Sequence, residues 1–351
     1  MHHGGATIIV GVRHARVGGP GRPRRWAGLA IGAILLVPCP SVPAGDWPQW
    51  GRTAGRNMAC PETNLPADVT AAPLDWAVNL GTGTYGTPAL ANGKIVIGTN
   101  DSCLHDDRLK VDGGGLVMCL NAADGSVLWQ LPIPPLRVPN ISHFDGMFLG
   151  ICSPPTIDGD RVYLVSNRGE VLCLDLGGQA NGNDGPFLTE GQYMARKGQA
   201  PWDIRPGDGD ILWRYDMVAQ VPCYPHDAAC SAVLIHGDLA YVGTSNGVDH
   251  THVNVPCPYT ASLIALDKKT GRLVARDDER IGTRIFDGQW SSPTLGTVAG
   301  KTLVFYGGGD GICYAFEALE ACPPGQNVAT LKKAWATDCN PPEYRVRDGK
   351  V

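Results

Sequence analysis

The hydrophobic positions of the chain recur in short alternating stretches, and the same arrangement of stretches appears four times. Each copy begins with a small-residue or Ser/Thr-Pro segment, passes a turn glycine into an alternating stretch, and ends with a second turn and further apolar stretches. In the first copy the alternating stretches are residues 94–98, 116–120 and 127–129. Alternation with a period of two predicts β-strands. Each copy therefore predicts a sheet of four short strands.

The four repeated units define the predicted fold. They are residues 86–131, 151–216, 230–278 and 290–338. One small sheet cannot bury both of its faces, so consecutive sheets are expected to stack around an axis and bury one another. A bare propeller blade needs roughly 40 to 50 residues, so the wider spacing here indicates an insertion in each blade. We predict an all-β fold, a β-propeller of four-stranded antiparallel blades, of which four are visible.

A further strand is predicted ahead of the first unit, at residues 74–80. It has the apolar alternation of an outer strand and the tryptophan, Trp76. Each of the four units already has its own outer strand, so this one has no blade. Propellers of this kind commonly close by lending an N-terminal strand to the last blade. The surplus strand therefore predicts an incomplete ring whose partner strands lie beyond Val351.

Residues 1–44 are predicted to be a cleaved signal peptide. An arginine-rich stretch precedes an apolar run at residues 26–37, and Val42-Pro43-Ala44 ends the segment with small residues. The apolar run is shorter than the roughly 20 residues that a membrane-spanning helix needs. We expect residues 45–351 to form a periplasmic or secreted propeller without a transmembrane anchor. A lipoprotein is less favoured, because Pro38 precedes Cys39.

The charge balance narrows the range of partners. The formal net charge is −5, and residues 1–44 carry arginines but no acidic residue, so the chain without them is more acidic still. An acidic chain that lacks a basic run has no electrostatic footprint for a phosphate backbone. Nucleic acid is therefore not an expected partner.

The cysteines fall into two groups. The alignment of the units places Cys119, Cys173 and Cys313 on the third strand of their blades among apolar neighbours, so we expect them to be buried and unpaired. Export would permit disulfides elsewhere. The better disulfide candidates are Cys223 with Cys230 and Cys322 with Cys339. No Cys-x-x-Cys motif occurs, so a zinc or thioredoxin-type site of that kind has no support.

The blade motifs resemble a known repeat family. Residues 266–274 (LDKKTGRLV), residues 120–129 (LNAADGSVLW) and the Ser-Pro blade starts are similar to pyrroloquinoline quinone (PQQ) repeats with tryptophan-docking motifs. The opening DWPQWGR at residues 46–52 resembles exported PQQ-like propeller proteins of the planctomycete type. Such repeats build quinoprotein alcohol dehydrogenases and the propeller lipoprotein of the outer-membrane β-barrel assembly machinery. The resemblance covers residues 46–351 and implies the fold, but a fold alone does not give a function.

The resemblance also sets a test for catalysis. A quinoprotein dehydrogenase holds a calcium-bound quinone between a tryptophan and a disulfide of two adjacent cysteines, with an aspartate as base. No two cysteines are adjacent in this sequence, and no matching set of calcium ligands can be placed. A Walker loop, a dinucleotide fingerprint and a Ser-His-Asp order are absent as well. We therefore predict no catalytic residue and no cofactor, with PQQ and calcium kept as the alternative.

Polar residues concentrate in insertions around the third unit, and loops on a rigid scaffold are where propellers bind ligands. The candidate ligand-binding residues are Tyr224, His226, Asp227, Asp249, His250, His252, Gln289 and Trp290. Gln289 and Trp290 could face the axial funnel, although packing between blades is the favoured role for the tryptophan. His250 and His252 beside Asp249 could ligate zinc or copper, but hydrogen bonding to turns is the favoured role for loop histidines.

A second polar cluster, in the second unit, resembles a calcium loop. Its residues are Asp175, Asn181, Asn183 and Asp184. An EF-hand loop requires glutamate at its twelfth position, and this sequence has Gln192 there. We therefore assign no metal ligand from the sequence.

These patterns together favour a binding protein over an enzyme. The predicted function is that of an exported, non-catalytic propeller scaffold that binds a protein, peptide or polysaccharide of the cell envelope through its loop face or axial funnel. The alternative is a PQQ-dependent quinoprotein oxidoreductase of the alcohol dehydrogenase type.

Overall fold

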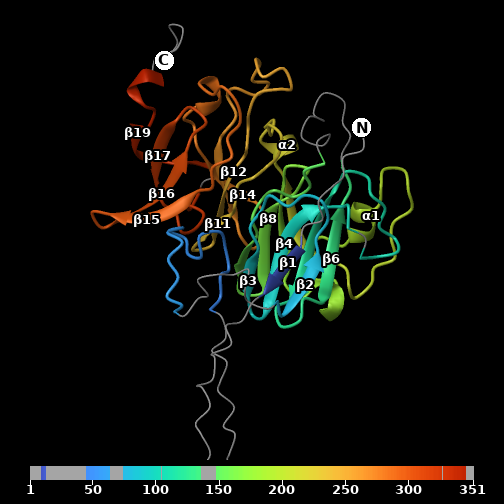
Figure 1. The fold of residues 1–351 in the computed structure, drawn as a ribbon. Coiled ribbons are helices and arrows are strands. Elements are labelled where there is room, and N and C mark those ends of the chain that lie inside the picture. The colour runs from blue at the N-terminus through green and yellow to red at the C-terminus, as the bar shows by residue number, and fades with distance from the viewer. Residues whose placement is uncertain are drawn as a thin grey trace, which may run out of the picture.

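The computed structural model of the protein describes residues 9–12, 45–63, 74–103, 105–135, 148–325 and 327–344. Their regular secondary structure is mostly strand, and the strands are arranged in four small sheets and one two-stranded pair (Figure 1). Each small sheet corresponds to one repeated unit, so the predicted all-β propeller of four-stranded antiparallel blades is confirmed. Apart from residues 9–12, the predicted signal peptide lies outside the described residues.

Blades 1 and 2 follow the repeat closely, with consecutive strands paired antiparallel from the inner to the outer strand. Blade 1 consists of β3 (Ala89–Ala91), β4 (Lys94–Asn100), β5 (Gly115–Asn121) and β6 (Val127–Ile133). Blade 2 consists of β7 (Thr156–Asp158), β8 (Arg161–Val165), β9 (Glu170–Asp175) and β10 (Ile211–Asp216). The inner strands β3, β7 and β11 lie side by side.

Blades 3 and 4 have the same order of strands, with one addition. Blade 3 consists of β11 (Leu234–His236), β12 (Leu239–Gly243), β13 (Leu263–Asp267) and β14 (Leu273–Arg276). Blade 4 consists of β15 (Thr294–Val298), β16 (Lys301–Gly307), β17 (Ile312–Glu317) and β19 (Lys333–Asp338). The short strand β18 (Ala329–Thr330) pairs parallel with β14 and gives blade 3 a fifth strand, which the repeat pattern does not predict. Blade 4, in orange and red, and blade 1, in cyan, lie at opposite sides of Figure 1.

Short helices occupy the insertions and connections. Between β9 and β10 lie η2 (Gly178–Asn181) and α1 (Glu190–Met194). The other short helices are α2 (Met217–Gln220), η3 (Ile281–Thr283) and η4 (Pro342–Tyr344). Among the described residues, no helix combines the length and the apolar character needed to cross a membrane.

A bulge between the third and fourth strands recurs in every blade, and it corrects one cysteine assignment. Beside this bulge, the residue opposite the outer-strand tryptophan is Cys119 in blade 1 and Cys173 in blade 2. Both cysteines are fully buried. In blade 4 the residue opposite Trp335 is Ala315. Cys313 therefore lies two residues too early to be their equivalent, and it is only partly buried.

Three tryptophans join each sheet to the next in the same way. In each case the indole N–H donates a hydrogen bond to a backbone carbonyl at the turn after the third strand of the following blade. The pairs are Trp76 with Ala122 at 3.1 Å, Trp129 with Leu176 at 3.0 Å, and Trp213 with Lys268 at 3.0 Å. These contacts satisfy the one polar atom of a side chain that otherwise buries a large apolar surface.

The same turns carry glycines that the tryptophans require. Gly125, Gly178 and Gly271 all have positive φ, and a Cβ atom at any of them would lie 2.4 to 2.6 Å from an indole atom. Only glycine combines the left-handed backbone with such close approach of a ring. The repeated contact between a tryptophan ring and a turn glycine therefore fixes how each sheet packs against the next.

The strand predicted ahead of the first unit is β2 (Trp76–Asn79), and it belongs to none of the four blades. It pairs antiparallel with β1 (Ile9–Val12), which lies inside the predicted signal peptide. Trp76 packs against blade 1 as Trp129 packs against blade 2. Thus β2 stands where the outer strand of a blade preceding blade 1 would stand.

Residues 46–57, here called the axial segment, contact the inner strands or blade starts of all four blades. Trp47 forms a bridge with Leu90 of β3, and the N–H of Ile157 in β7 donates to the Pro48 carbonyl at 2.7 Å. At the other end of the segment, the Leu295 N–H of β15 donates to the Ala54 carbonyl at 2.9 Å. In Figure 1 this segment is the blue trace below β15 and β11.

Arg56 fastens the axial segment to blades 3 and 4. Its guanidinium donates hydrogen bonds to the carbonyls of Pro293 at 2.8 Å, Val233 at 3.3 Å and Ala232 at 3.4 Å. It also donates to the Trp50 carbonyl at 2.7 Å and lies over the Trp50 ring. Burial lowers the pKa of Arg56 to about 10, because the cation is removed from water.

Candidate functional site

One cavity is lined by the same position of all four blades. Tyr85, Cys152, Cys230 and Trp290 each lie four residues before the inner strand of their blade, and all four line a cavity of about 410 Å³, here called the axial cavity. Because the inner strands surround the propeller axis, residues at this position form a ring around it. The repeat therefore places four side chains of different chemistry around one opening.

The lining of the axial cavity is aromatic and uncharged. The aromatic side chains are those of Trp50, Tyr85, Trp290, Phe305 and Tyr306. Tyr85 is 66% exposed and Trp290 is 41% exposed, so two of the rings are open to solvent. The described lining contains no carboxylate, amide or cationic side chain. This lining does not fit a calcium-bound quinone, whose metal requires oxygen ligands and whose own carboxylates require donors.

Cysteine contacts around this cavity differ from the predicted pairing. The thiols of Cys152 and Cys230, from blades 2 and 3, lie close enough to shift each other's pKa, upward for Cys152 and downward for Cys230. Cys223 is buried elsewhere and not joined to Cys230. Cys322 and Cys339 are likewise not joined. The spacing along the chain misled the prediction because equivalent blade positions meet at the axis even though they lie far apart in sequence.

Trp290 connects the axial cavity to a cluster of histidines. Its indole N–H donates to the His226 carbonyl at 3.1 Å, and the rings of His226 and Trp290 lie 6.0 Å apart. His226 in turn lies edge-on to His252, with ring centroids 4.8 Å apart. The Asp287 carboxylate lies 2.9 Å from His226 Nε2 and 3.6 Å from His252 Nδ1. We call His226, His252 and Asp287 the histidine cluster.

The structure thus brings together some of the predicted binding residues and separates others. His226, His252 and Trp290 meet, with Asp227 Oδ1 3.7 Å from His226 Nε2. The remaining predicted residues either form hydrogen bonds with the backbone or lie outside the histidine cluster. Gln289 is buried and donates to Asn246, Tyr224 is buried, Asp249 caps the turn that holds His252, and His250 is exposed.

Asp287 is the member of the histidine cluster that the sequence analysis missed. It lies in the connection between blades 3 and 4, far along the chain from His226. No motif marks it, because the contact depends on how two loops fold over the blade ends. Asp287 lies two residues before Gln289, which the sequence analysis did select. A search for acidic residues close to the start of each blade would therefore have included Asp287.

An acidic cluster lies in the insertion of blade 2, close to the predicted calcium-like loop. Asp175, Asp184 and Asp210 place carboxylate oxygens within 4.8 Å of one another. Burial, together with the nearby charges of Glu190, Asp175 and Asp184, raises the pKa of Asp210 to about 7, although the Asp184 N–H opposes this. Asn181 and Asn183, predicted for the same loop, donate to Asp184 and Glu190.

Replacing Asp210 with asparagine is expected to stabilise the fold at pH 8 and to have little effect at pH 5. A carboxyl whose pKa is raised on folding stabilises the fold while it is protonated, and that stability is lost as the pH rises from about 4 to about 7. One unit of pKa shift corresponds to about 1.4 kcal/mol, so we expect a gain of about 1 kcal/mol or more at pH 8. Urea unfolding at both pH values, in the presence of EDTA, measures it.

The matched control for this prediction is Asp208→Asn. Asp208 is equally buried but lies 2.5 Å from the Arg108 guanidinium. Its neutralisation should destabilise the fold at both pH values. An Asp210→Asn variant that changes stability equally at pH 5 and pH 8 would contradict the prediction.

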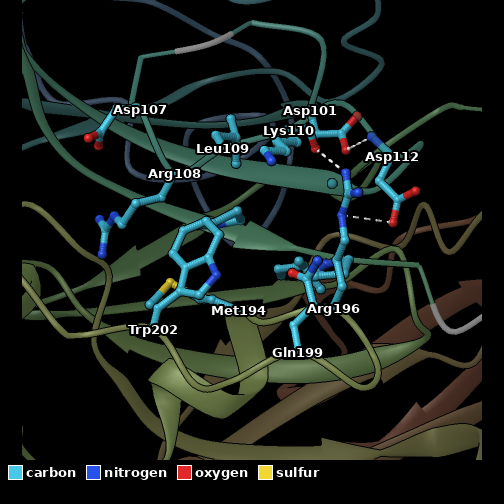
Figure 2. Close-up of a pocket in the computed structure, with 14 residues that line it drawn as sticks. Asp101, Asp107, Arg108, Leu109, Lys110, Asp112, Met194, Arg196, Gln199 and Trp202 are labelled. Atoms are coloured by element: carbon cyan, nitrogen blue, oxygen red, sulfur yellow. Dashed lines mark hydrogen bonds and ion pairs between the residues drawn. The ribbon is translucent and has the colours of Figure 1, made fainter.

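A second pocket, of about 280 Å³, lies between blade 1 and the insertion of blade 2 (Figure 2). Trp202 and Arg196 lie on opposite sides of the view. Both arginines beside it already have carboxylate partners: Arg196 Nε lies 3.3 Å from Asp112, and Arg108 pairs with Asp106 and Asp208. The sequence analysis did not find this pocket, because its walls come from insertions without a repeated pattern.

Comparisons with known proteins agree with the fold. Residues 73–317, more than half of the chain, match the family model described as outer membrane protein assembly factor BamB. No curated protein sequence matches significantly. The crystal structure of a quinohemoprotein alcohol dehydrogenase from Comamonas testosteroni is 15% identical, with a TM-score of 0.51, over 84% of this chain and 41% of that chain.

Two further solved structures are similar over most of this chain. BamB from Moraxella catarrhalis is 13% identical, with a TM-score of 0.40, over 77% of this chain and 56% of that chain. A europium-containing methanol dehydrogenase is 13% identical, with a TM-score of 0.49, over 85% of this chain and 49% of that chain. The chain thus spans about half the length of each of these proteins. At such low sequence identities the likeness concerns the fold alone.

Proposed function

Since the chain belongs to the family of the outer membrane protein assembly factor BamB, we propose that it is a non-catalytic scaffold of the cell envelope. In this proposal it is exported to the periplasm or secreted, and it binds a peptide segment of an envelope protein in the axial cavity. The observation that carries the proposal is the pair of exposed aromatic rings, Tyr85 and Trp290, which a repeated blade position directs to one opening.

The chemistry of the cavity supports a peptide ligand. Exposed aromatic rings on a rigid support provide apolar contact area with little loss of side-chain freedom, and tryptophan and tyrosine dominate binding energy at interfaces. The uncharged lining offers ring faces together with the hydroxyls of Ser291 and Ser292. Such a surface suits apolar side chains of an extended segment, with few hydrogen bonds to its backbone. A polysaccharide is the other outcome that the experiment distinguishes.

The test compares the wild type with Tyr85→Ala/Trp290→Ala against two immobilised probes, a display library of random heptapeptides and a panel of envelope polysaccharides. We expect enriched apolar peptides whose affinity falls at least about 30-fold in the double variant, since loss of one aromatic hot spot costs about 2 kcal/mol or more. The control variant is Tyr259→Ala, which removes an exposed ring outside the axial cavity and should leave the affinity unchanged.

Three outcomes would overturn the proposal. If the protein retains polysaccharide and no peptide, the ligand is a polysaccharide. If Tyr259→Ala lowers the peptide affinity as much as the double variant does, the peptide does not bind in the axial cavity. A stoichiometric complex with added PQQ and Ca²⁺ that oxidises alcohols in a dye-coupled assay would favour the quinoprotein alternative.

A further inference from the structure

The histidine cluster gathers metal-ligand atoms from three separate loops. His226 precedes blade 3, His252 lies in the insertion between β12 and β13, and Asp287 precedes blade 4. One ligand atom from each lies within 4.8 Å of the other two. Zinc binds histidine nitrogen and carboxylate oxygen at about 2.0 to 2.2 Å, so neighbouring ligands of one ion lie up to about twice that distance apart. Small side-chain adjustments would therefore place all three atoms around a single ion.

The tautomer of His226 is set by its surroundings in the way a metal ligand requires. Its Nδ1 lies 2.9 Å from the Val248 carbonyl oxygen. A carbonyl can only accept a hydrogen bond, so Nδ1 carries the proton. In the neutral ring, Nε2 then carries the lone pair, and this atom faces Asp287. Metal-bound histidines nearly always donate their second ring N–H to a carbonyl or carboxylate in this manner.

His252 is held beside His226 by a turn of unusual backbone. His252 has a φ of 56°, a left-handed conformation that costs a non-glycine residue free energy. The turn is closed by the His252 N–H donating to the Asp249 carbonyl at 3.0 Å and the Asp249 N–H donating to the Asn254 carbonyl at 2.8 Å. Asp249, predicted as a ligand-binding residue, therefore acts by positioning His252.

The alternative for this cluster is an ordinary ion pair, which the metal titration described below distinguishes from a metal site. One carboxylate, Asp287, faces two imidazoles, and a second, Asp227, lies 3.7 Å from His226 Nε2. In an ion pair, a protonated His226 donates from Nε2 to Asp287, and His252 donates to the same carboxylate from Nδ1. A divalent ion serves both rings and the carboxylate at once.

We propose that His226, His252 and Asp287 form a binding site for a divalent transition metal of the zinc class, with Asp227 or water completing the coordination. Two imidazoles with carboxylate oxygen favour zinc, and related transition ions, over calcium, which prefers oxygen ligands alone. The ion would join the loops before blade 3, within blade 3 and before blade 4. Through the hydrogen bond from Trp290 to the His226 carbonyl, it would also stiffen one wall of the axial cavity.

The experiment uses the full chain purified without a histidine tag and stripped with EDTA. Titration with Zn²⁺ is followed by calorimetry, and titration with Co²⁺ by visible absorption, which reports tetrahedral nitrogen and oxygen ligation directly. We expect one strong equivalent of either ion that Ca²⁺ does not displace, and a higher melting temperature with Zn²⁺, because an ion that binds only the native state stabilises it.

The variants are chosen at exposed positions, so that they fold. His252→Ala and Asp287→Asn alter side chains that are 57% and 54% exposed, and each should weaken Zn²⁺ binding at least about 100-fold. His250→Ala, the neighbouring exposed histidine, is the matched control and should leave the affinity unchanged.

Absence of a strong Zn²⁺ equivalent in the wild type would overturn the proposal, as would an equal loss in His250→Ala. A Co²⁺ spectrum that is unchanged by His252→Ala would do the same. These readouts do not involve peptide binding, so failure of the metal site and failure of the proposed function are separable.

Discussion

Replacement of Arg56 by methionine should destabilise the fold by about 3 kcal/mol. The variant keeps most of the apolar stem but leaves the carbonyls of Pro293, Ala232 and Val233 without the guanidinium that bonds them. Hydrogen bonds to a charged group contribute about 1.5 to 3 kcal/mol each in favourable cases, and the contact with the Trp50 ring adds to this. Urea unfolding followed by circular dichroism measures the loss.

Arg52→Met is the control for this prediction. Arg52 also has positive φ and also lies over a tryptophan ring, Trp47. Within the part of the chain that the structure describes, its side chain donates only to the Ala59 carbonyl, in an exposed setting. Its replacement should cost less than about 1 kcal/mol. Equal effects of the two variants would show that the axial segment does not depend on the buried guanidinium.

Trp213→Ala is expected to cost about 3 to 5 kcal/mol, the range for removing a large aromatic side chain from a core. Trp213 is 3% exposed, packs 6.1 Å from the Tyr163 ring centre, and donates to the Lys268 carbonyl. Its loss opens a cavity between blades 2 and 3 and leaves that carbonyl without the indole N–H. The melting temperature and the urea midpoint should both fall.

The chain contains its own control for this loss. Trp335 occupies the same position on the outer strand of blade 4, but it is 39% exposed. Trp335→Ala should cost about 1 kcal/mol or less, because little apolar surface is lost from the interior. Should Trp335→Ala prove as damaging as Trp213→Ala, the contact between neighbouring blades is not what makes the indole important.

The blades could be predicted from the sequence because the information for them is local. Alternating side chains and turn glycines are set by the strand period, and the tryptophans mark where one sheet meets the next. The error at Cys313 arose at the same level, because a sequence alignment does not reveal the bulge that fixes which residue of β17 faces Trp335. A shift of two residues keeps a side chain on the same face, so the apolar pattern alone does not expose the mistake.

The candidate sites were less predictable because their geometry depends on loops. His226 and His252 could be selected as polar residues in insertions, but Asp287 joins them only through the fold of a third loop. The ring of Tyr85, Cys152, Cys230 and Trp290 has no common residue type, so the equivalence of these positions becomes visible only once the inner strands are aligned in space. The acidic cluster around Asp210 was equally hard to predict, because Asp175 and Asp184 come from other parts of blade 2 and meet Asp210 only in the folded structure.

The axial segment has a consequence for the order of folding. In a repeat protein each unit contacts mainly its neighbours, so blades can form one after another as the chain is synthesised. The bonds from Arg56 to Pro293 and from Thr294 to Ala54 join residues 237 and 240 positions apart. Such distant contacts form late, because closing long loops is entropically costly. The first residues of the propeller should therefore be among the last to become protected from hydrogen exchange, after blade 4 has formed. An array of separately folding sheets would then become one cooperative unit in a single final step.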